Sequence, residues 1–298
     1  MKQFICFSFF LSIITGMIFA EDEPDLKTHF IPNEIESHTS IQLYVPTVGG
    51  ASVGVLQDFV FPHNNIALNL GVNISPVSFN LLTQTTWTPI PFLKLYGGIK
   101  AGTGWNYEDM FGNQQNGMGI YRYDGAEGVD GSGFDGIVWK ARIGTTFQFD
   151  FAAINPGDWH HVIIITNNEI QYQEFTKVKD GEYWYYHEMP GDGFSQNSFN
   201  YYFSGILGYQ MPIFIDFTAL VYEITVPFYN PYSGKNLSST DPEHSLMLLT
   251  RFKINKHFNI ALMTNIKNGP VHPIIQDMKR EWKWKFFSTQ LVLTYKFK

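Results

Sequence analysis

Side chains that alternate between apolar and polar recur along almost the whole chain, and this period of two constrains the fold more than any other feature of the sequence. In the stretch TTFQFDFAAI (145–154), three phenylalanines alternate with Gln148 and Asp150. Successive side chains of a β-strand point to opposite faces, so each such segment is two-sided. An acidic residue among phenylalanines is explained if one face of the strand meets an apolar medium and the other a polar one.

The alternating segments are long. Most have about 10 or more residues, as a tilted strand needs to cross a bilayer, whereas strands of soluble sheets usually have about five or six. A half-buried strand of a soluble β-sandwich alternates in the same way and is the alternative. The segments are 38–45, 51–61, 65–74, 77–87, 92–103, 136–152, 159–175, 197–209, 213–228, 245–254, 258–267 and 285–297.

The composition favours a lipid environment. Aromatic residues make up 17% of the chain and charged residues only 16%, although charged residues alone reach about a quarter of a typical soluble domain. No run of 18 apolar residues follows residue 20, so the sequence predicts no transmembrane helix. Strands that cross a bilayer fit an aromatic-rich and charge-poor chain, because lipid then contacts the apolar face of each strand.

The connections between the segments are alternately tight and long. The tight ones are 62–65, 88–91, 155–158, 210–212 and 255–257, and the long ones are 104–135, 176–196, 229–244 and 268–284. Barrels that cross the outer membrane have short periplasmic turns, long extracellular loops and an even number of strands. We therefore predict an all-β fold, a transmembrane antiparallel up-and-down β-barrel of about 12 strands with both termini in the periplasm.

Two segments depart from the simple pattern. Segment 159–175 contains Asn167 and Asn168 in tandem, which could form a hairpin turn, but splitting the segment there gives an odd number of strands. We keep it as one strand. In segment 213–228, Glu223 shares its face with Val221 and Phe217. We expect this face to point outward, with Glu223 near the outer end, where lipid no longer demands apolar contact.

The N-terminus has the pattern of a secretory signal peptide. Lys2 precedes an apolar stretch at 4–18, and Ala20 stands before the acidic EDEPD. An N-terminal anchor helix is the alternative. Cys6, the only cysteine, lies in this stretch, so the mature chain would use no disulfide. We expect a signal peptide at 1–20, a periplasmic N-terminal segment at 21–37 and the barrel at 38–298.

Aromatic residues gather where the segments end. This is the arrangement of the aromatic girdles that mark the two membrane interfaces. Near the tight turns lie Trp87, Phe92, Trp159, Tyr209, Phe258 and Phe297, and near the long connections lie Trp105, Trp139, Phe228, Trp282 and Trp284.

With this signal peptide, the alternation over 38–297 and the C-terminal QLVLTYKFK, the chain resembles the bacterial outer-membrane β-barrel class. Proteins of that class usually end in an amphipathic strand closed by an aromatic residue, and the resemblance implies that the barrel-assembly machinery recognises this strand. Here Phe297 is penultimate and Lys298 follows. The resemblance further implies location in the outer membrane and contact with its lipid.

Catalytic motifs are absent from the sequence. It contains no G-x-S-x-G, no H-E-x-x-H and no phosphate-binding loop. Outer-membrane phospholipases of similar size carry a His and a Ser on lipid-facing strand positions, and His38 and Ser40 have only the spacing of such a pair. We therefore predict that the chain is not an enzyme and uses no cofactor.

The loop YDGAEGVDGSGFDG (123–136) invites a calcium interpretation. Asp124, Glu127, Asp130 and Asp135 supply hard oxygen ligands, and the glycines allow tight turns. Their spacing matches neither an EF-hand loop nor a nonapeptide repeat. A mobile, acidic, exposed loop is the alternative, and a loop of this length could also fold into the lumen and constrict it.

Charged residues on the faces expected to point inward form two groups. Near the periplasmic end, Asp58, Asp150 and Asp216 have Lys94, Arg251 and Lys253 as possible partners. Toward the outer half, Lys100, Lys140 and Arg142 lie on neighbouring segments without an acidic residue on those two inward faces. Basic side chains grouped in a low-dielectric wall favour anions, which predicts an anion-preferring lumen constriction. Simple filling of the lumen by long polar side chains is the alternative.

These observations predict a channel or porin-like protein for small polar solutes, anions included. The alternatives are a closed barrel with a structural or surface-interaction role, a membrane-embedded hydrolase and a soluble secreted β-sandwich. The net charge of −7 argues against a nucleic-acid partner.

Overall fold

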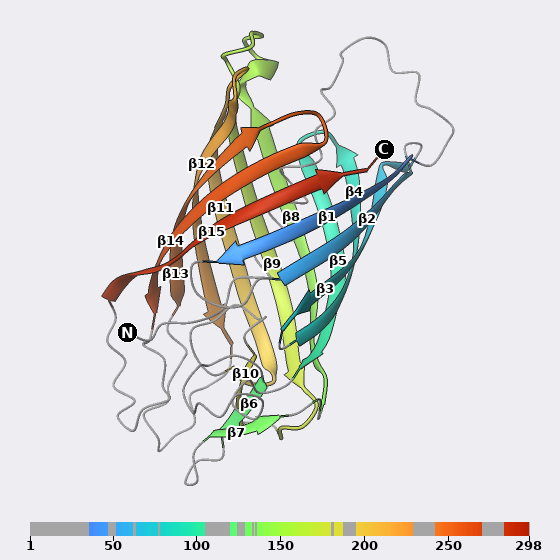
Figure 1. Cartoon of the computed structure of the whole chain (residues 1–298), viewed down its shortest axis with the longest axis vertical. Helices are drawn as coiled ribbons and strands as arrows, with labels where there is room; N and C mark the ends of the chain where they lie inside the picture. Colours follow the sequence, from blue (N-terminus) through green and yellow to red (C-terminus); the bar gives the residue numbers. More distant parts are fainter. Residues whose placement is uncertain are drawn as a thin grey trace.

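The computed structural model describes residues 36–46, 52–61, 64–76, 78–104, 120–123, 129–132, 134, 136–179, 182–186, 195–228, 242–269 and 283–297. Twelve long strands in these ranges form one closed barrel (Figure 1). They are β1 (Glu36–Pro46), β2 (Ser52–Phe61), β3 (Ile66–Ser75), β4 (Ser78–Ile90), β5 (Leu93–Gly104), β8 (Val138–Asp150), β9 (Val162–Phe175), β11 (Ser198–Gln210), β12 (Ile215–Pro227), β13 (Glu243–Lys253), β14 (Phe258–Gly269) and β15 (Lys283–Lys296).

The barrel closes where the last strand meets the first. Each long strand pairs antiparallel with the long strand that follows it in sequence, and β15 pairs back onto β1, with Leu43 opposite Leu293. The backbone N–H of Phe297 donates to the Thr39 carbonyl at 3.0 Å beyond the last paired residues. Closure leaves no free sheet edge, so the ladder hydrogen bonds are satisfied all the way round. A single closed sheet rules out the β-sandwich alternative.

All twelve predicted segments are strands, and the fold class is confirmed. Residues 162–175 form one continuous strand, β9, so the tandem Asn167 and Asn168 make no hairpin. The predicted signal peptide at 1–20 lies outside the described residues. Strand β1 begins at Glu36, inside the segment 21–37 that we expected to precede the barrel.

The turn between β8 and β9 is larger than predicted. Segments 136–152 and 159–175 were expected to run closer together, but β8 ends at Asp150 and a short 3-10 helix, η2 (Phe151–Ala153), follows. The Asp150 carboxylate accepts a hydrogen bond from the Ala152 backbone N–H at 2.9 Å and therefore caps this helix. The other carboxylate oxygen lies 2.6 Å from Nδ1 of His161, which ties the two ends of the turn together.

A second, smaller sheet was not predicted. It has the strand order β10-β6-β7, from Tyr183–Tyr186, Ile120–Tyr123 and Val129–Ser132. These strands come from the two longest connections and lie at the lower end of the barrel in Figure 1. Each has only four residues, too few for alternation to be recognised in the sequence.

The outward faces of the strands are apolar and exposed. Ile143 on β8 is 68% exposed, and Leu207 on β11 is 55% exposed. The aromatic residues expected at the two membrane interfaces are also on the surface. Trp87 and Trp159 near the short turns are 48% and 51% exposed, and Trp284 near a long connection is 50% exposed. Trp105 and Trp282 lie outside the described residues. Among the residues that the structure describes, no helix is long and apolar enough to cross a bilayer.

Candidate functional site in the barrel lumen

The three basic residues singled out in the sequence point into the barrel. Lys100 on β5 and Lys140 on β8 are direct cross-strand neighbours, and Arg142 lies two residues further along β8. They are 5%, 2% and 5% exposed, respectively, while Ile143 beside them faces outward. The alternation therefore brings Lys100, Lys140 and Arg142 together on adjacent inward faces.

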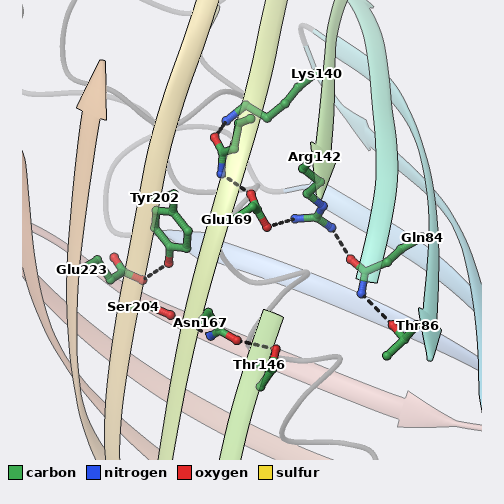
Figure 2. Close-up of polar contacts among 11 residues, drawn as sticks. Gln84, Thr86, Lys140, Arg142, Thr146, Asn167, Glu169, Tyr202, Ser204 and Glu223 are labelled. Atoms are coloured by element: carbon green, nitrogen blue, oxygen red, sulfur yellow. Dashed lines mark hydrogen bonds and ion pairs between the residues drawn. The ribbon is translucent and has the colours of Figure 1, made fainter. Parts of the chain in front are cut away.

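Lys140 and Arg142 belong to a hydrogen-bonded network that Figure 2 shows. Lys140 Nζ donates to Gln171 Oε1 at 2.5 Å, and the Gln171 amide donates to Glu169. Arg142 Nη1 lies 3.9 Å from Glu169 Oε2, and Arg142 Nη2 donates to Gln84 Oε1 at 2.6 Å. We call Lys140, Arg142, Gln171, Glu169 and Gln84, together with Lys100, the basic network.

Glycine at position 98 allows this network to cross a strand. Gly98 on β5 stands between Arg142 on β8 and Gln84 on β4 in the register. A Cβ atom at this position would lie 2.5 Å from the Thr83 carbonyl oxygen and 3.2 Å from Gln84. Because no side chain occupies the inward face there, the Arg142 guanidinium reaches across β5 to the Gln84 amide.

Glu169 is the member of the site that sequence reasoning missed. It is 1% exposed and faces inward from β9 beside Arg142. Polar residues at alternate positions of β9, namely Asn167, Glu169, Gln171 and Gln173, mark this inward face in the sequence. The three basic residues and Glu169 together carry a net charge of +2. The basic character survives, but a carboxylate moderates it.

The charges at the periplasmic end pair only in part as expected. Asp216 and Arg251 form a bidentate ion pair, with N–O distances of 2.9, 3.1 and 2.7 Å. Asp58 instead accepts a hydrogen bond from the Asn69 amide at 2.6 Å. Asp150 contacts His161, not Lys94 or Lys253.

The outward placement predicted for Glu223 is wrong. The register between β12 and β13 shifts between Ile215 and Phe217, so Asp216 and Phe217 both lie on the inward side. Beyond this bulge, Val221 and Glu223 also face inward, with 0% and 3% exposure. The Tyr202 hydroxyl donates to Glu223 Oε1 at 3.2 Å, so the carboxylate has a polar partner inside the barrel (Figure 2).

The buried apolar side chains of the interior gather in one sector. We call them the apolar wall: the buried hydrophobic side chains that point inward from β9, β11 to β15 and β1. All are at most 8% exposed, and Val221, Met247 and Leu249 are at 0–1%. The members are Tyr44, Ile165, Tyr202, Ile206, Phe217, Ala219, Val221, Met247, Leu249, Ala261, Met263 and Val292.

The facing sector, from β2 to β5 and β8, is polar. We call its inward side chains the polar wall. In the half nearer the short turns, Asp58, Asn69, Gln84, Thr86 and Lys94 are only partly buried. Further toward the long connections the wall is covered, since Ser78 and Asn80 are each 1% exposed.

A cluster of large side chains covers the end with the long connections. Trp184 and Tyr186 of β10 pack with Val138, Phe175 and Val178, and we call these five residues the cap cluster. The Tyr186 hydroxyl donates to Asn80 Oδ1 of β4 at 2.7 Å. A Cβ at Gly102 would lie 2.7 Å from that hydroxyl, so the missing side chain makes room for Tyr186.

Three residues of the cap cluster, Val178, Trp184 and Tyr186, come from the connection 176–197. We had considered such a constriction for loop 104–135, most of which lies outside the described residues.

Of the four predicted cation ligands, only Asp130 lies within the described residues. Asp124, Glu127 and Asp135 lie outside the described residues, and Asp130 is a residue of β7 whose backbone pairs with Arg122. Within the described part of the chain, no group of three or more His, Cys, Asp or Glu side chains could hold a metal ion.

His38 and Ser40 do not have the lipid-facing placement of a membrane-embedded hydrolase. Their cross-strand neighbours on β2 are Asp58 and Leu56. These positions continue the inward face of Gln42, which is 1% exposed. Both side chains therefore point into the barrel.

The geometry of the barrel identifies the class of protein. The sheet is closed and antiparallel, has an even number of strands, and alternates apolar side chains outward with a charged network inward. The chain is an outer-membrane β-barrel. Its outward apolar side chains suit contact with lipid. In barrels of this class the short turns lie in the periplasm and the long connections lie outside the cell, and we name the two ends of this barrel accordingly.

Comparisons with known proteins find similarity among solved structures only. No family model and no curated protein matches the chain. Among solved structures, it is similar to the KdgM porin (9% identity, 88% of this chain and 99% of that one, TM-score 0.42). It is also similar to the NanC porin (6% identity, 87% of this chain and 99% of that one, TM-score 0.47). A third similar structure is the Pseudomonas putida toluene transporter TodX (8% identity, 90% of this chain and 88% of that one, TM-score 0.38). At these identities and scores, the solved structures identify no ligand for this barrel.

Proposed function

We propose that this outer-membrane barrel is a narrow channel that carries small polar solutes, preferentially anions, along its polar wall. The observation that carries the proposal is the contrast in exposure inside the barrel. Thr86 and Lys94 on the polar wall are partly open, whereas the apolar wall opposite is packed shut. A solute entering from the periplasm would follow the polar wall up to the basic network.

Electrostatics supports the preference for anions. Lys100, Lys140, Arg142 and Glu169 carry a net charge of +2 and lie within a few side-chain lengths of one another. A low-dielectric wall focuses the field of such a cluster into the lumen. Charged side chains that line a pore select ions of opposite sign.

The test is the reversal potential of single channels in a planar bilayer with a salt gradient. The wild-type barrel should prefer anions, and a triple variant, Lys100→Gln, Lys140→Gln and Arg142→Gln, should lose that preference. Lys253→Gln, an exposed lysine at the periplasmic end of β13, is the matched control and should change little. A cation preference that the triple substitution leaves unchanged would refute the role of the basic network.

A second candidate, a closed barrel with a structural or surface-interaction role, is favoured by one observation. The cap cluster covers the outer end with Trp184 and Tyr186 at 0% and 1% exposure, and the apolar wall fills part of the interior. The same bilayer experiment separates the candidates, because a closed barrel would conduct no ions.

We propose no catalytic role for His38 and Ser40, because lipid substrates would not reach side chains that face the lumen. Hydrolysis of lipid in detergent micelles that is lost in Ser40→Ala would contradict this.

For assembly, we propose that the barrel-assembly machinery recognises β15. Its alternate residues Leu291 and Tyr295 face lipid at 38% and 46% exposure.

A further inference from the structure

Asn168 is an amide on the lipid-facing side of the barrel. It is an exposed residue of β9, and its inward neighbours Asn167 and Glu169 are both 1% exposed. It lies six residues beyond Val162, which is opposite Tyr209, and four residues before Tyr172. Six residues of a tilted strand rise by about 15 Å, which places Asn168 near the middle of an apolar band about 25 Å tall.

Of the two polar atoms of the Asn168 amide, only the oxygen is hydrogen-bonded at this depth. The Tyr201 hydroxyl donates to Asn168 Oδ1 at 2.8 Å. Among the described residues, the Asn168 Nδ2 donors make no hydrogen bond. An unmade hydrogen bond is costly in hydrocarbon, where no water replaces the partner.

Several other outward polar groups avoid this cost. The hydroxyls of Thr264 and Thr289 lie 3.2 Å apart, and the Thr218 hydroxyl donates to the Leu249 carbonyl at 3.3 Å. Gln57 also faces outward, but it donates to Ser37 at 2.8 Å near the periplasmic ends of β1 and β2. The Asn168 amide therefore differs from these groups in needing an acceptor from outside its own barrel.

A second protein chain can supply that acceptor. Lipid tails carry no acceptor at this depth, whereas a second copy of the barrel presents its own Asn168 at the same depth. Around a two-fold axis, each Nδ2 can donate to the other copy's Oδ1, so the amide is complementary to itself. We propose that the outward face of β8, β9 and β11 is a homodimer interface in the membrane, with Asn168 at its centre.

The side chains around Asn168 suit such an interface. Thr145 on β8 is its direct cross-strand neighbour, and the small hydroxyl side chain lets a second surface approach closely. Ile143 and Ile170 form the next outward cross-strand pair along β8 and β9, at 68% and 49% exposure. Leu207, at 55% exposure, lies opposite Ile164, four residues before Asn168. These side chains would pack between the two barrels.

The first test is disulfide cross-linking of Asn168→Cys in native outer membranes. The only natural cysteine, Cys6, lies in the predicted signal peptide and is changed to Ser in every variant. Ile41→Cys is the matched control, because Ile41 is 38% exposed on β1, on the far side of the strand order from β9. Asn168→Cys should give a species of twice the monomer mass, and Ile41→Cys should not. Equal yields, or a cross-link to a different polypeptide, would overturn the proposal.

The second test measures association directly. Energy transfer between labelled barrels in lipid vesicles should fall in Asn168→Leu, with the dimer dissociation constant raised about tenfold. Leucine suits a lipid-facing position, so folding should be unaffected. Thr250→Leu, also outward but on β13, is the control and should associate like the wild type. Unchanged association of Asn168→Leu would overturn the proposal.

Discussion

The apolar wall and the polar wall are built from the same kind of strand, yet their inward side chains differ in polarity and in exposure to the lumen. Outward, both present apolar side chains to lipid. Inward, β12 and β13 present Val221 and Met247, which pack as in a soluble core, whereas β4 and β5 present Thr86 and Lys94, which stay partly open. The difference teaches that the packed apolar side chains gather on one half of the barrel wall, whereas the other half stays partly open to solvent.

The largest expected effect comes from placing a charge in the apolar wall. Val221→Asp would bury a carboxylate between its cross-strand neighbours Ile206 and Met247, and should lower the free energy of unfolding by about 3–5 kcal/mol. Leu82→Asp makes a similar change on the polar wall, where Lys100 is the cross-strand neighbour, and should be mild. Reversible urea unfolding in lipid vesicles measures both. Equal losses would mean that the two walls are not distinct.

The next effect concerns the ion pair at the periplasmic end of the apolar wall. Asp216→Asn leaves the buried Arg251 without its carboxylate and should cost roughly 3 kcal/mol of unfolding free energy. The same vesicle assay should show that Arg251→Met in addition to Asp216→Asn costs less than the sum of the single changes. Strict additivity would show that the pair contributes no coupling.

A smaller effect is expected at the cap cluster, where the polar wall is covered. Tyr186→Phe removes the hydrogen bond to Asn80, worth about 1 kcal/mol. The backbone N–H of Trp184, which donates to the Ser195 carbonyl at 2.8 Å, should then exchange with deuterium about five times faster. Exchange at the wild-type rate would show that this hydrogen bond does not hold β10 in place.

The smallest effect concerns selectivity. Glu169→Gln keeps the side-chain shape and its contact with Gln171 but removes the carboxylate beside Arg142. The anion-to-cation permeability ratio should rise by about a factor of two, as the field of the basic network strengthens. Reversal potentials measure this ratio, and a fall in the ratio would contradict the role assigned to Glu169.

The alternation was sufficient to predict the barrel, because each face of a strand that separates lipid from lumen leaves a period of two in the sequence. The same pattern placed Lys100, Lys140 and Arg142 on neighbouring inward faces. It failed at Asp216, where a bulge reverses the faces of the residues that follow, and nothing in a simple period of two signals such a shift. It also missed β10, whose contacts with Asn80 and Phe175 depend on how a long connection folds.

The central claim is that the solute path follows the polar wall, and cysteine accessibility tests it most directly. Thr86→Cys and Ala219→Cys, each with Cys6→Ser, place one thiol on the polar wall and one on the apolar wall. A charged thiol reagent added on the periplasmic side of a planar bilayer should react with Thr86→Cys and reduce its current. The same reagent should leave Ala219→Cys unchanged. Block at Ala219→Cys with no effect at Thr86→Cys would contradict the account.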